Sequence, residues 1–168
     1  EHAVLRKGEH DLSTSKLFAE KYSHLRFVRG VGRFADHEDL HNIANNHFAD
    51  DVQESLVIEE EVRGRPVVCA VIQSSNGDDL YALPPSGEVY AAEREAVEQA
   101  AVAAHKALGL RHYSVAHFIV NRFGPHVVHV SVAPPLHAEA HFAKSLATVG
   151  LTLGDFLDHV ITLSLRKP

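Results

Sequence analysis

The sequence lacks methionine and tryptophan and contains one cysteine. A chain without methionine does not begin at its translational start, so we expect residues upstream of Glu1 to have been removed. The single cysteine, Cys69, excludes an internal disulfide, and its place in the apolar run VVCAVI predicts a buried thiol. No apolar run approaches the roughly 20 residues of a spanning helix, and the first ten residues lack a signal-peptide core. We therefore expect a cytoplasmic protein with no membrane partner.

Long blocks of one charge sign are also missing, and the formal net charge is −6. A negative chain has the wrong sign for the phosphate backbone, so we expect no nucleic-acid partner. The chain carries 14 histidines, and their protonation would reverse the sign of its net charge in mildly acidic solution. At 168 residues and 45% apolar composition, the chain is long enough for one well-buried core. We expect a single globular domain over residues 1–168.

The first half of the chain predicts short strands at residues 3–6 and 26–34, with a short helix in the polar segment between them. A longer helix follows, because Asp36 is a suitable N-cap and the next apolar positions share one helical face. These positions are Leu40, Ile43, Ala44 and Phe48. The β-rich runs within residues 55–72 are joined by RGR, so we expect them to form a hairpin with its turn at Gly64.

The second half predicts a helix from about Glu93 to Leu108, with the apolar stripe Val97, Ala101, Ala104 and Leu108, and with Gly109 as its left-handed cap. A hairpin follows, formed by HYSVAHFIV and HVVHVSV around the loop NRFGP. If Val120 pairs with His126, then His117 faces His129 and Val115 faces Ser131. Two helices end the chain, one over residues 137–149 and one that opens with the T-x-x-D box of Thr152 and Asp155 and buries Phe156, Val160 and Leu163. The fold class is therefore α+β, with a largely antiparallel sheet and packed helices.

Two stretches in the last third of the chain carry a resemblance to a known family. The first is HKALGLRHYSVAHFIVNRFGPHVVHVSVAPPL and the second is AKSLATVGLTLGDFLDHVI. The first resembles the helix, strand, hairpin and closing turn, and the second the two final helices, of the C-terminal part of ATP-grasp ligases of the D-alanine:D-alanine ligase type. LVIEEEVRGRPVVCAVI resembles the strand, hinge and strand that carry the family's adenine contacts. The resemblance covers residues 30–165, matches residues 1–30 poorly, and leaves out the family's N-terminal domain. It implies an ATP-grasp-like fold.

The same resemblance implies that the catalytic residues have been replaced. The two metal-binding carboxylates of the family fall on His117 and His129, and its asparagine falls on Ser131. Imidazole is a poor ligand for Mg²⁺, which prefers oxygen. The arginine and the glycine N–H that stabilise the oxyanion fall on Val115 and Pro135, neither of which has a donor to offer.

Most of the residues with which the family binds the nucleotide also lack a counterpart in this sequence. The ribose-binding glutamate falls on Pro66, and no lysine occurs between Lys21 and Lys106. The glycine-rich phosphate loop falls on DLS, which lacks glycine. Glu59 and Glu60 remain at the adenine hinge, and Arg6 stands in for a phosphate-binding lysine. We therefore expect ATP and Mg²⁺ not to be cofactors.

Four histidines form a second candidate site. His117 and His129 stand where the resemblance implies carboxylates, and a helix beginning at His137 would place His137 and His141 one turn apart on the same side. Together they would offer four imidazoles to a borderline metal such as Zn²⁺. The alternative is that His117 and His129 are a neutral, stacked pair filling an empty cleft, while His137 and His141 are solvated. A dyad of Cys69 and His105 is a further candidate, although a cysteine within an apolar strand usually has a structural role.

These observations predict a catalytically inactive ATP-grasp-like domain that acts as a binding or assembly module, either with an unknown protein partner or by self-association. The alternatives are the histidine-lined transition-metal site, weak ATP or ADP binding, and residual carboxylate-amine ligase activity in a fragment of a working ligase.

Overall fold

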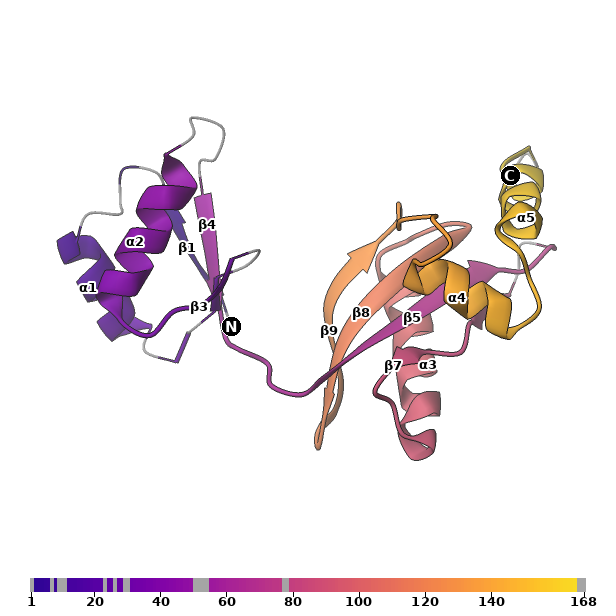
Figure 1. Cartoon of the computed structure of the whole chain (residues 1–168), viewed down its shortest axis with the longest axis horizontal. Coiled ribbons are helices and arrows are strands. Elements are labelled where there is room, and N and C mark those ends of the chain that lie inside the picture. The colour runs from indigo at the N-terminus through magenta and orange to yellow at the C-terminus, as the bar shows by residue number, and fades with distance from the viewer. Residues whose placement is uncertain are drawn as a thin grey trace. The chain divides into compact units, whose positions relative to one another are not determined.

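The computed structural model describes residues 2–6, 8, 12–22, 24, 25, 27, 28, 31–49, 55–76 and 79–165. It divides into two compact units, residues 1–62 and residues 63–168, each of which is described here by itself (Figure 1). The described part of each unit contains one sheet and its own buried apolar residues. The mixed α and β content with antiparallel sheets confirms the predicted fold class. The single domain over residues 1–168 stays a prediction.

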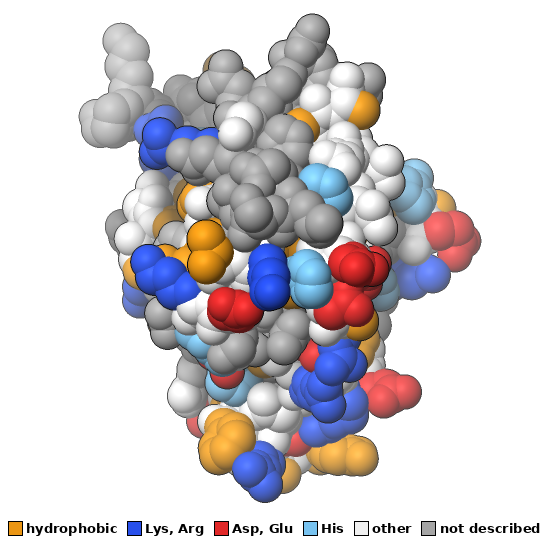
Figure 2. All heavy atoms as spheres, turned by 90° about the vertical axis from the view of Figure 1, so that its left-hand side faces the viewer, with side chains coloured by type: hydrophobic (Ala, Val, Ile, Leu, Met, Phe, Trp, Pro, Cys, Tyr) orange, Lys and Arg blue, Asp and Glu red, His pale blue; other side chains and the backbone are white. Residues whose placement is uncertain are grey.

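The first unit is a four-stranded antiparallel sheet in the order β1-β4-β2-β3, with two helices packed on one face. Apolar side chains from alternate strand positions, such as Leu5 and Ile58, meet Leu40 and Phe48 of the second helix in this core. On the side of the molecule drawn in Figure 2, described acidic, basic and histidine side chains are interspersed. The elements are β1 (His2–Arg6), α1 (Leu12–Lys21), β2 (Phe27–Val28), β3 (Gly32–Arg33), α2 (His37–Phe48) and β4 (Ser55–Glu59).

Helix α2 forms as its sequence predicts. The carboxylate of Asp36 accepts hydrogen bonds from the backbone N–H groups of Glu38 and Asp39, both at 3.0 Å. These bonds satisfy two donors that the first turn of a helix leaves without a partner. Leu40, Ala44 and Phe48 are buried, as the apolar spacing requires.

The second unit is a five-stranded antiparallel sheet, in which β6-β5-β8-β9 lie side by side and β7 also pairs with β5. Helix α3 packs on one face of this sheet, where its Val97 meets Cys69 of β5 and Phe118 of β8. Helices α4 and α5 pack on the other face, where Phe142 and Phe156 meet Val115. The elements are β5 (Arg65–Gln73), β6 (Leu80–Ala82), β7 (Ser86–Gly87), α3 (Ala91–Ala107), β8 (Tyr113–Asn121), β9 (Gly124–Ser131), α4 (His141–Thr148) and α5 (Leu153–Leu165).

The predicted hairpin over residues 55–72 is wrong. Strand β4 pairs with β1 and β2, whereas β5 pairs with β6, β7 and β8, so the two strands belong to different sheets. Residues 60–64 between them contain no strand or helix. Gly64 makes no tight turn but lies close to β8, where an added Cβ would sit 2.4 Å from the carbonyl oxygen of Val120. The glycine is therefore required for close backbone packing.

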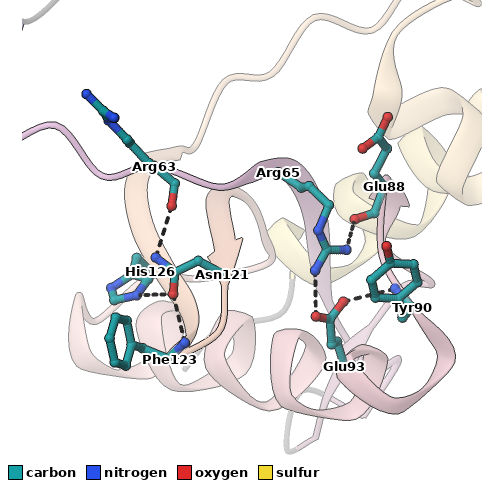
Figure 3. A network of polar contacts seen from close by, with 8 residues as sticks. All are labelled: Arg63, Arg65, Glu88, Tyr90, Glu93, Asn121, Phe123 and His126. Atoms are coloured by element: carbon teal, nitrogen blue, oxygen red, sulfur yellow. Dashed lines mark hydrogen bonds and ion pairs between the residues drawn. The ribbon is translucent and has the colours of Figure 1, made fainter.

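A polar network fixes the start of β5 to the rest of its unit (Figure 3). The guanidinium of Arg65 donates to the Glu88 carbonyl and to the Glu93 carboxylate, both at 2.6 Å, and lies over the Tyr90 ring. The other oxygen of Glu93 accepts from the backbone N–H of Tyr90, which completes the N-terminal cap of α3. Because the same carboxylate serves the cap and the ion pair, the first turn of α3 is tied to the start of β5.

Helix α3 carries one correction to its predicted apolar stripe. Val97 and Ala101 are buried as expected, but the third buried position is His105, while Leu108 is 59% exposed. The stripe therefore follows a spacing of four residues, which keeps one face of the helix over the sheet. Gly109 has φ +61° and ends the helix as predicted.

Within the described residues, no single helix combines the length and apolar character needed to span a membrane. Helices α4 and α5 reach that length and composition only as a pair, with a bend of 95° between them.

Candidate functional site

The candidate site lies on the face of the second sheet that α4 and α5 partly cover. Alternate residues of β8 point to opposite faces. Ala116 and Phe118 pack with α3, whereas Val115 belongs to the core beneath α4 and α5. His117 follows Val115 on this second face and is half-buried. It is therefore placed next to the apolar core rather than within it.

A transverse row of residues crosses the sheet at His117. Ser86 of β7 pairs with Val68 of β5, Val68 pairs with His117 of β8, and His117 pairs with His129 of β9. The two imidazole rings have centroids 5.5 Å apart and planes tilted by 52°. This confirms the predicted pairing of the two histidines, but the tilt means that their rings are not stacked. Ser86, which the sequence reasoning missed, lies in the turn region PPSG and carries no distinctive pattern.

The register around this pair contains a β-bulge. Val115 pairs with Ser131 as predicted, but Val120 pairs with Pro125 and not with His126. One additional residue of β9, Val128, lies between the two registers, since Phe118 pairs with Val127 and His117 with His129. The bulge therefore brings His129 back opposite His117.

Helix α4 begins at His141, so the prediction that it begins at His137 is wrong. Residues 137–140 form a turn, in which the Ala140 N–H donates to the His137 carbonyl at 2.9 Å. His137 is therefore not one helical turn from His141. His141 contacts the transverse row instead, with its Nδ1 3.1 Å from the Ser86 hydroxyl oxygen.

The electrostatic environment keeps His117 neutral. Burial lowers the pKa of His117 below its usual value, and the neighbouring imidazoles of His129 and His141 lower it further. His117 therefore offers a neutral imidazole on the sheet face at neutral pH.

Three of the four predicted metal ligands belong to or contact the transverse row, since His129 pairs with His117 and His141 contacts Ser86, whereas His137 is in the turn before α4. In the part of the chain that the structure describes, no three His, Cys, Asp or Glu side chains are grouped so that they could hold a metal ion. The sequences of β8 and β9 contain no aspartate or glutamate. The zinc site stays a prediction.

The residues predicted to contact a nucleotide lie in the first unit. Arg6 pairs with Ser55 at one end of the β1–β4 ladder, and Glu59 pairs with His2 at the other. Four residues of strand separate them, which corresponds to about 13 Å. Glu60 is exposed and follows β4 directly. The structure therefore places Arg6 and Glu59 on one ladder without bringing them together. The DLS segment begins at Asp11, which lies outside the described residues.

Cys69 and His105 do not form a dyad. The Cys69 thiol donates to the Leu83 carbonyl at 3.4 Å, and burial raises its pKa to about 12. His105 is buried and bonds through Nδ1 to the Ser114 hydroxyl at 2.8 Å. A thiol with such a high pKa is protonated at neutral pH, so Cys69 packs as a small apolar residue.

A cavity of about 600 Å³ opens between the first turns of α5 and the strands β5 and β6. Its walls include Ile72, Tyr81, Phe156 and His159. The Nε2 of His159 donates to the Gln73 carbonyl at 2.7 Å and so ties α5 to β5. The sequence reasoning missed this histidine, whose helix position carries no motif.

No family model matches the sequence, but individual proteins of known sequence or structure do. A D-alanine–D-alanine ligase from Desulfotalea psychrophila is 29% identical over 150 residues, which cover 73% of this chain and 46% of the ligase. One from Desulfovibrio desulfuricans is 26% identical over 159 residues, which cover 80% of this chain and 50% of that ligase. The crystal structure of a D-alanine–D-alanine ligase from Bacillus anthracis, complexed with ATP, matches 99% of this chain with a TM-score of 0.79 at 24% identity.

The chain resembles the D-alanine–D-alanine ligases and shares their fold. It spans about half the length of the ligases that it matches in sequence. It also covers 59% of the Bacillus anthracis ligase and 51% of a ligase structure from Coxiella burnetii, which it matches with a TM-score of 0.76. The resemblance inferred from the sequence, and the ATP-grasp-like fold that it implied, are therefore confirmed.

Proposed function

We propose that this chain is an ATP-grasp-like domain that no longer joins amino acids and that serves as a binding or assembly module. The proposal rests mainly on the side chains that β8 and β9 present. His117, His129 and Ser131 stand where the ligase resemblance implies two carboxylates and an asparagine. Without a carboxylate on either strand, β8 and β9 offer Mg²⁺ none of the charged oxygen ligands that it prefers. Phosphoryl transfer depends on such charge neutralisation.

The surroundings of Val115 support the same proposal. The resemblance implies an arginine at this position, where it would stabilise the oxyanion of the tetrahedral intermediate. Val115 is 3% exposed and packs with Phe142 and Phe156. A valine side chain has no donor to place at a developing negative charge. Pro135, at the position of the glycine N–H, also lacks a donor.

The test is an assay for ATP consumption by the purified chain. Release of ADP is followed with Mg²⁺ and ATP, with and without D-alanine, beside an intact D-alanine–D-alanine ligase as positive control. We expect no ADP release that depends on D-alanine. ADP release that requires D-alanine, and that the substitution His117→Ala abolishes, would overturn the proposal.

Ligand binding gives an independent measurement. A ligand that binds only the native state at about 100 times its Kd stabilises that state by roughly 2.7 kcal/mol. We expect MgATP at millimolar concentration to leave the melting temperature of the chain unchanged. A rise in melting temperature with MgATP would instead support the alternative of nucleotide binding without turnover.

A further inference from the structure

The cavity between α5, β5 and β6 is present because the helical cover of the second sheet ends before the sheet does. Ile72 and Tyr81 are paired across β5 and β6, so their side chains share the face on which α4 and α5 pack. Leu83, two residues further along that face, is 4% exposed, whereas Tyr81 is 55% exposed. The cavity of about 600 Å³ is lined by both Ile72 and Tyr81. Its volume falls within the range of about 300 to 1,000 Å³ that small-molecule sites occupy.

Helix α5 supplies a carboxylate to the wall of this cavity. Asp155 and His159 are one helical turn apart, and both line the cavity. The Oδ2 of Asp155 accepts from the Thr152 N–H at 2.8 Å and from the Thr152 hydroxyl at 2.6 Å, which leaves Oδ1 without a partner among the described residues. These bonds to Thr152 also lower the pKa of Asp155. Its carboxylate is therefore charged at neutral pH and has one oxygen available to a ligand.

His159 adds a second acceptor. Its Nε2 lies 2.7 Å from the Gln73 carbonyl, and a carbonyl oxygen can only accept, so Nε2 carries the proton. In the neutral ring, Nδ1 is then left as an acceptor. In Figure 1, α5 stands at the end of the second unit where β5 ends, as this bond between His159 and Gln73 requires.

The strand side of the cavity adds a second carboxylate, that of Asp79. Ser74 holds the backbone of Asp79 in place, because the Ser74 N–H donates to the Asp79 carbonyl at 2.7 Å and the Asp79 N–H donates to the Ser74 hydroxyl at 3.1 Å. Neither lysine nor arginine occurs among the described residues that line the cavity. The cavity therefore combines an apolar and aromatic surface with acceptors and negative charge, and without a cation to balance them.

We infer that this cavity binds a small protonated amine that carries an aromatic ring. The ring would pack on Tyr81 and Ile72, since aromatic side chains favour contact with other rings. An ammonium group has three N–H donors, which match the acceptors of Asp155, His159 and Asp79. A ligand with a carboxylate or phosphate would instead meet two like charges. This inference gives a ligand class to the binding role proposed above and rests on that proposal.

The cavity is separate from the transverse row of histidines. Ile72 lies four residues along β5 from Val68, the partner of His117, which corresponds to about 13 Å of strand. No residue of the row lines the cavity. Because Asp155 and Asp79 are exposed, solvent screens their attraction for a cation. We therefore expect a dissociation constant of about 0.1 to 1 mM for a ligand of this size.

Titration of the isotope-labelled full chain with tryptamine, followed by amide chemical shifts, tests the inference. We expect saturable shifts at Ile72, Phe156 and His159, and none at His117. Indoleacetate has the same ring with the opposite charge, and it is expected to bind at least about 10-fold more weakly because the cavity offers it no cation. The comparison separates recognition of the amine from simple burial of the indole ring.

Two variants test the carboxylates. Asp155→Asn and Asp79→Asn keep the shape of each side chain and remove its charge, so each is expected to weaken tryptamine binding by about 3- to 10-fold. The matched control is Asp158→Asn, which removes the same charge from α5 at an exposed position that does not line the cavity. It is expected to bind within about twofold of the wild type. Asp79 takes no part in the cap of α5, so its variant remains informative if Asp155→Asn loosens that helix.

Three results would overturn the inference. They are shifts that do not saturate by about 5 mM tryptamine, equal affinity for tryptamine and indoleacetate, and wild-type affinity in both Asp155→Asn and Asp79→Asn. Each result would leave the ADP assay unaffected. Failure of the amine site and failure of the non-catalytic proposal are therefore distinguishable.

Discussion

At the scale of single residues, the buried pair of His105 and Ser114 should control how the protein responds to acid. His105 is 1% exposed, its Nδ1 contacts the Ser114 hydroxyl, and its Nε2 has no hydrogen-bond partner among the described residues. Burial lowers the pKa of His105 below the usual 6.5. At mildly acidic pH, His105 therefore binds a proton less readily in the folded protein than in the unfolded chain.

We predict that the free energy of unfolding falls as the pH drops below about 6.5. Above that pH, His105 is neutral in both states and contributes no pH dependence. Below it, the unfolded chain binds the proton first, so acid favours unfolding, and His117 acts in the same direction. Urea unfolding at pH 7.5 and at pH 5.5 measures the difference. In the double variant His105→Leu, Ser114→Ala we expect a smaller difference between the two pH values, and an unchanged difference would contradict the assignment to His105.

The single variant Ser114→Ala tests the contribution of the His105–Ser114 hydrogen bond to stability. It leaves the buried Nδ1 of His105 without a partner, which should cost about 1 to 3 kcal/mol at either pH, whereas replacing both partners with apolar groups is nearly neutral. Urea denaturation at pH 7.5 compares the single and double variants. A single variant as stable as the double variant would show that the hydrogen bond makes no net contribution.

Residue-level prediction from the sequence succeeded where alternation along a strand decides the outcome. The pairing of His117 with His129 followed from such alternation, although it was reached from an incorrect pairing of Val120. The bulge at Val128 compensated for that error, and no local pattern marks the bulge. Ser86 could not have been found, because its importance depends on β7 pairing with β5, far along the chain.

At the scale of elements, helix positions were predicted better than strand partners. Caps and apolar spacing act within a few residues, so α2 and the end of α3 were found from Asp36 and Gly109. The choice of β4 to pair with β1 rather than β5 depends on contacts distant in sequence. The predicted helix start at His137 was four residues too early, since residues 137–140 form a turn first.

Gly64 provides a prediction at this scale, because it sets how closely the chain before β5 approaches β8. Gly64→Ala would place a Cβ 2.4 Å from the Val120 carbonyl oxygen and 2.7 Å from the Ile119 side chain. Overpacking of this kind typically costs about 1 to 3 kcal/mol, and urea unfolding measures it. The matched control is Gly154→Ala in α5, where the nearest atom is 3.5 Å away. Alanine should stabilise that helix by about 0.5 to 1 kcal/mol. Equal effects at both glycines would contradict the packing argument.

At the scale of the whole molecule, the fold was predictable because the last third of the chain keeps the turns and helix ends of the ligase scaffold. Strand lengths, turn glycines and helix caps specify that scaffold, whereas the residues that catalyse ligation contribute little to it. The replacements that we propose at His117, Val115 and Pro135 are therefore compatible with the architecture. The exposed apolar positions of α5, which are Leu157, Ile161 and Leu165, mark a limit of such prediction, because helical spacing alone does not separate them from core positions.

The prediction of a single domain over residues 1–168 is open to calorimetry. If the chain folds as one cooperative domain, a single transition is expected, with the calorimetric enthalpy equal to the van't Hoff enthalpy. Two transitions would instead mean that residues 1–62 and 63–168 unfold separately. The separate cores of the two units make this measurement informative.

The bulge in β9 also bears on how the protein behaves when concentrated. β9 is an edge strand of its sheet, and exposed valines at positions 127 and 128 would otherwise make it a template for a strand from another molecule. Because the extra residue interrupts the hydrogen-bonding ladder, an incoming strand cannot pair along its full length. Concentrated solutions should therefore remain free of fibrils.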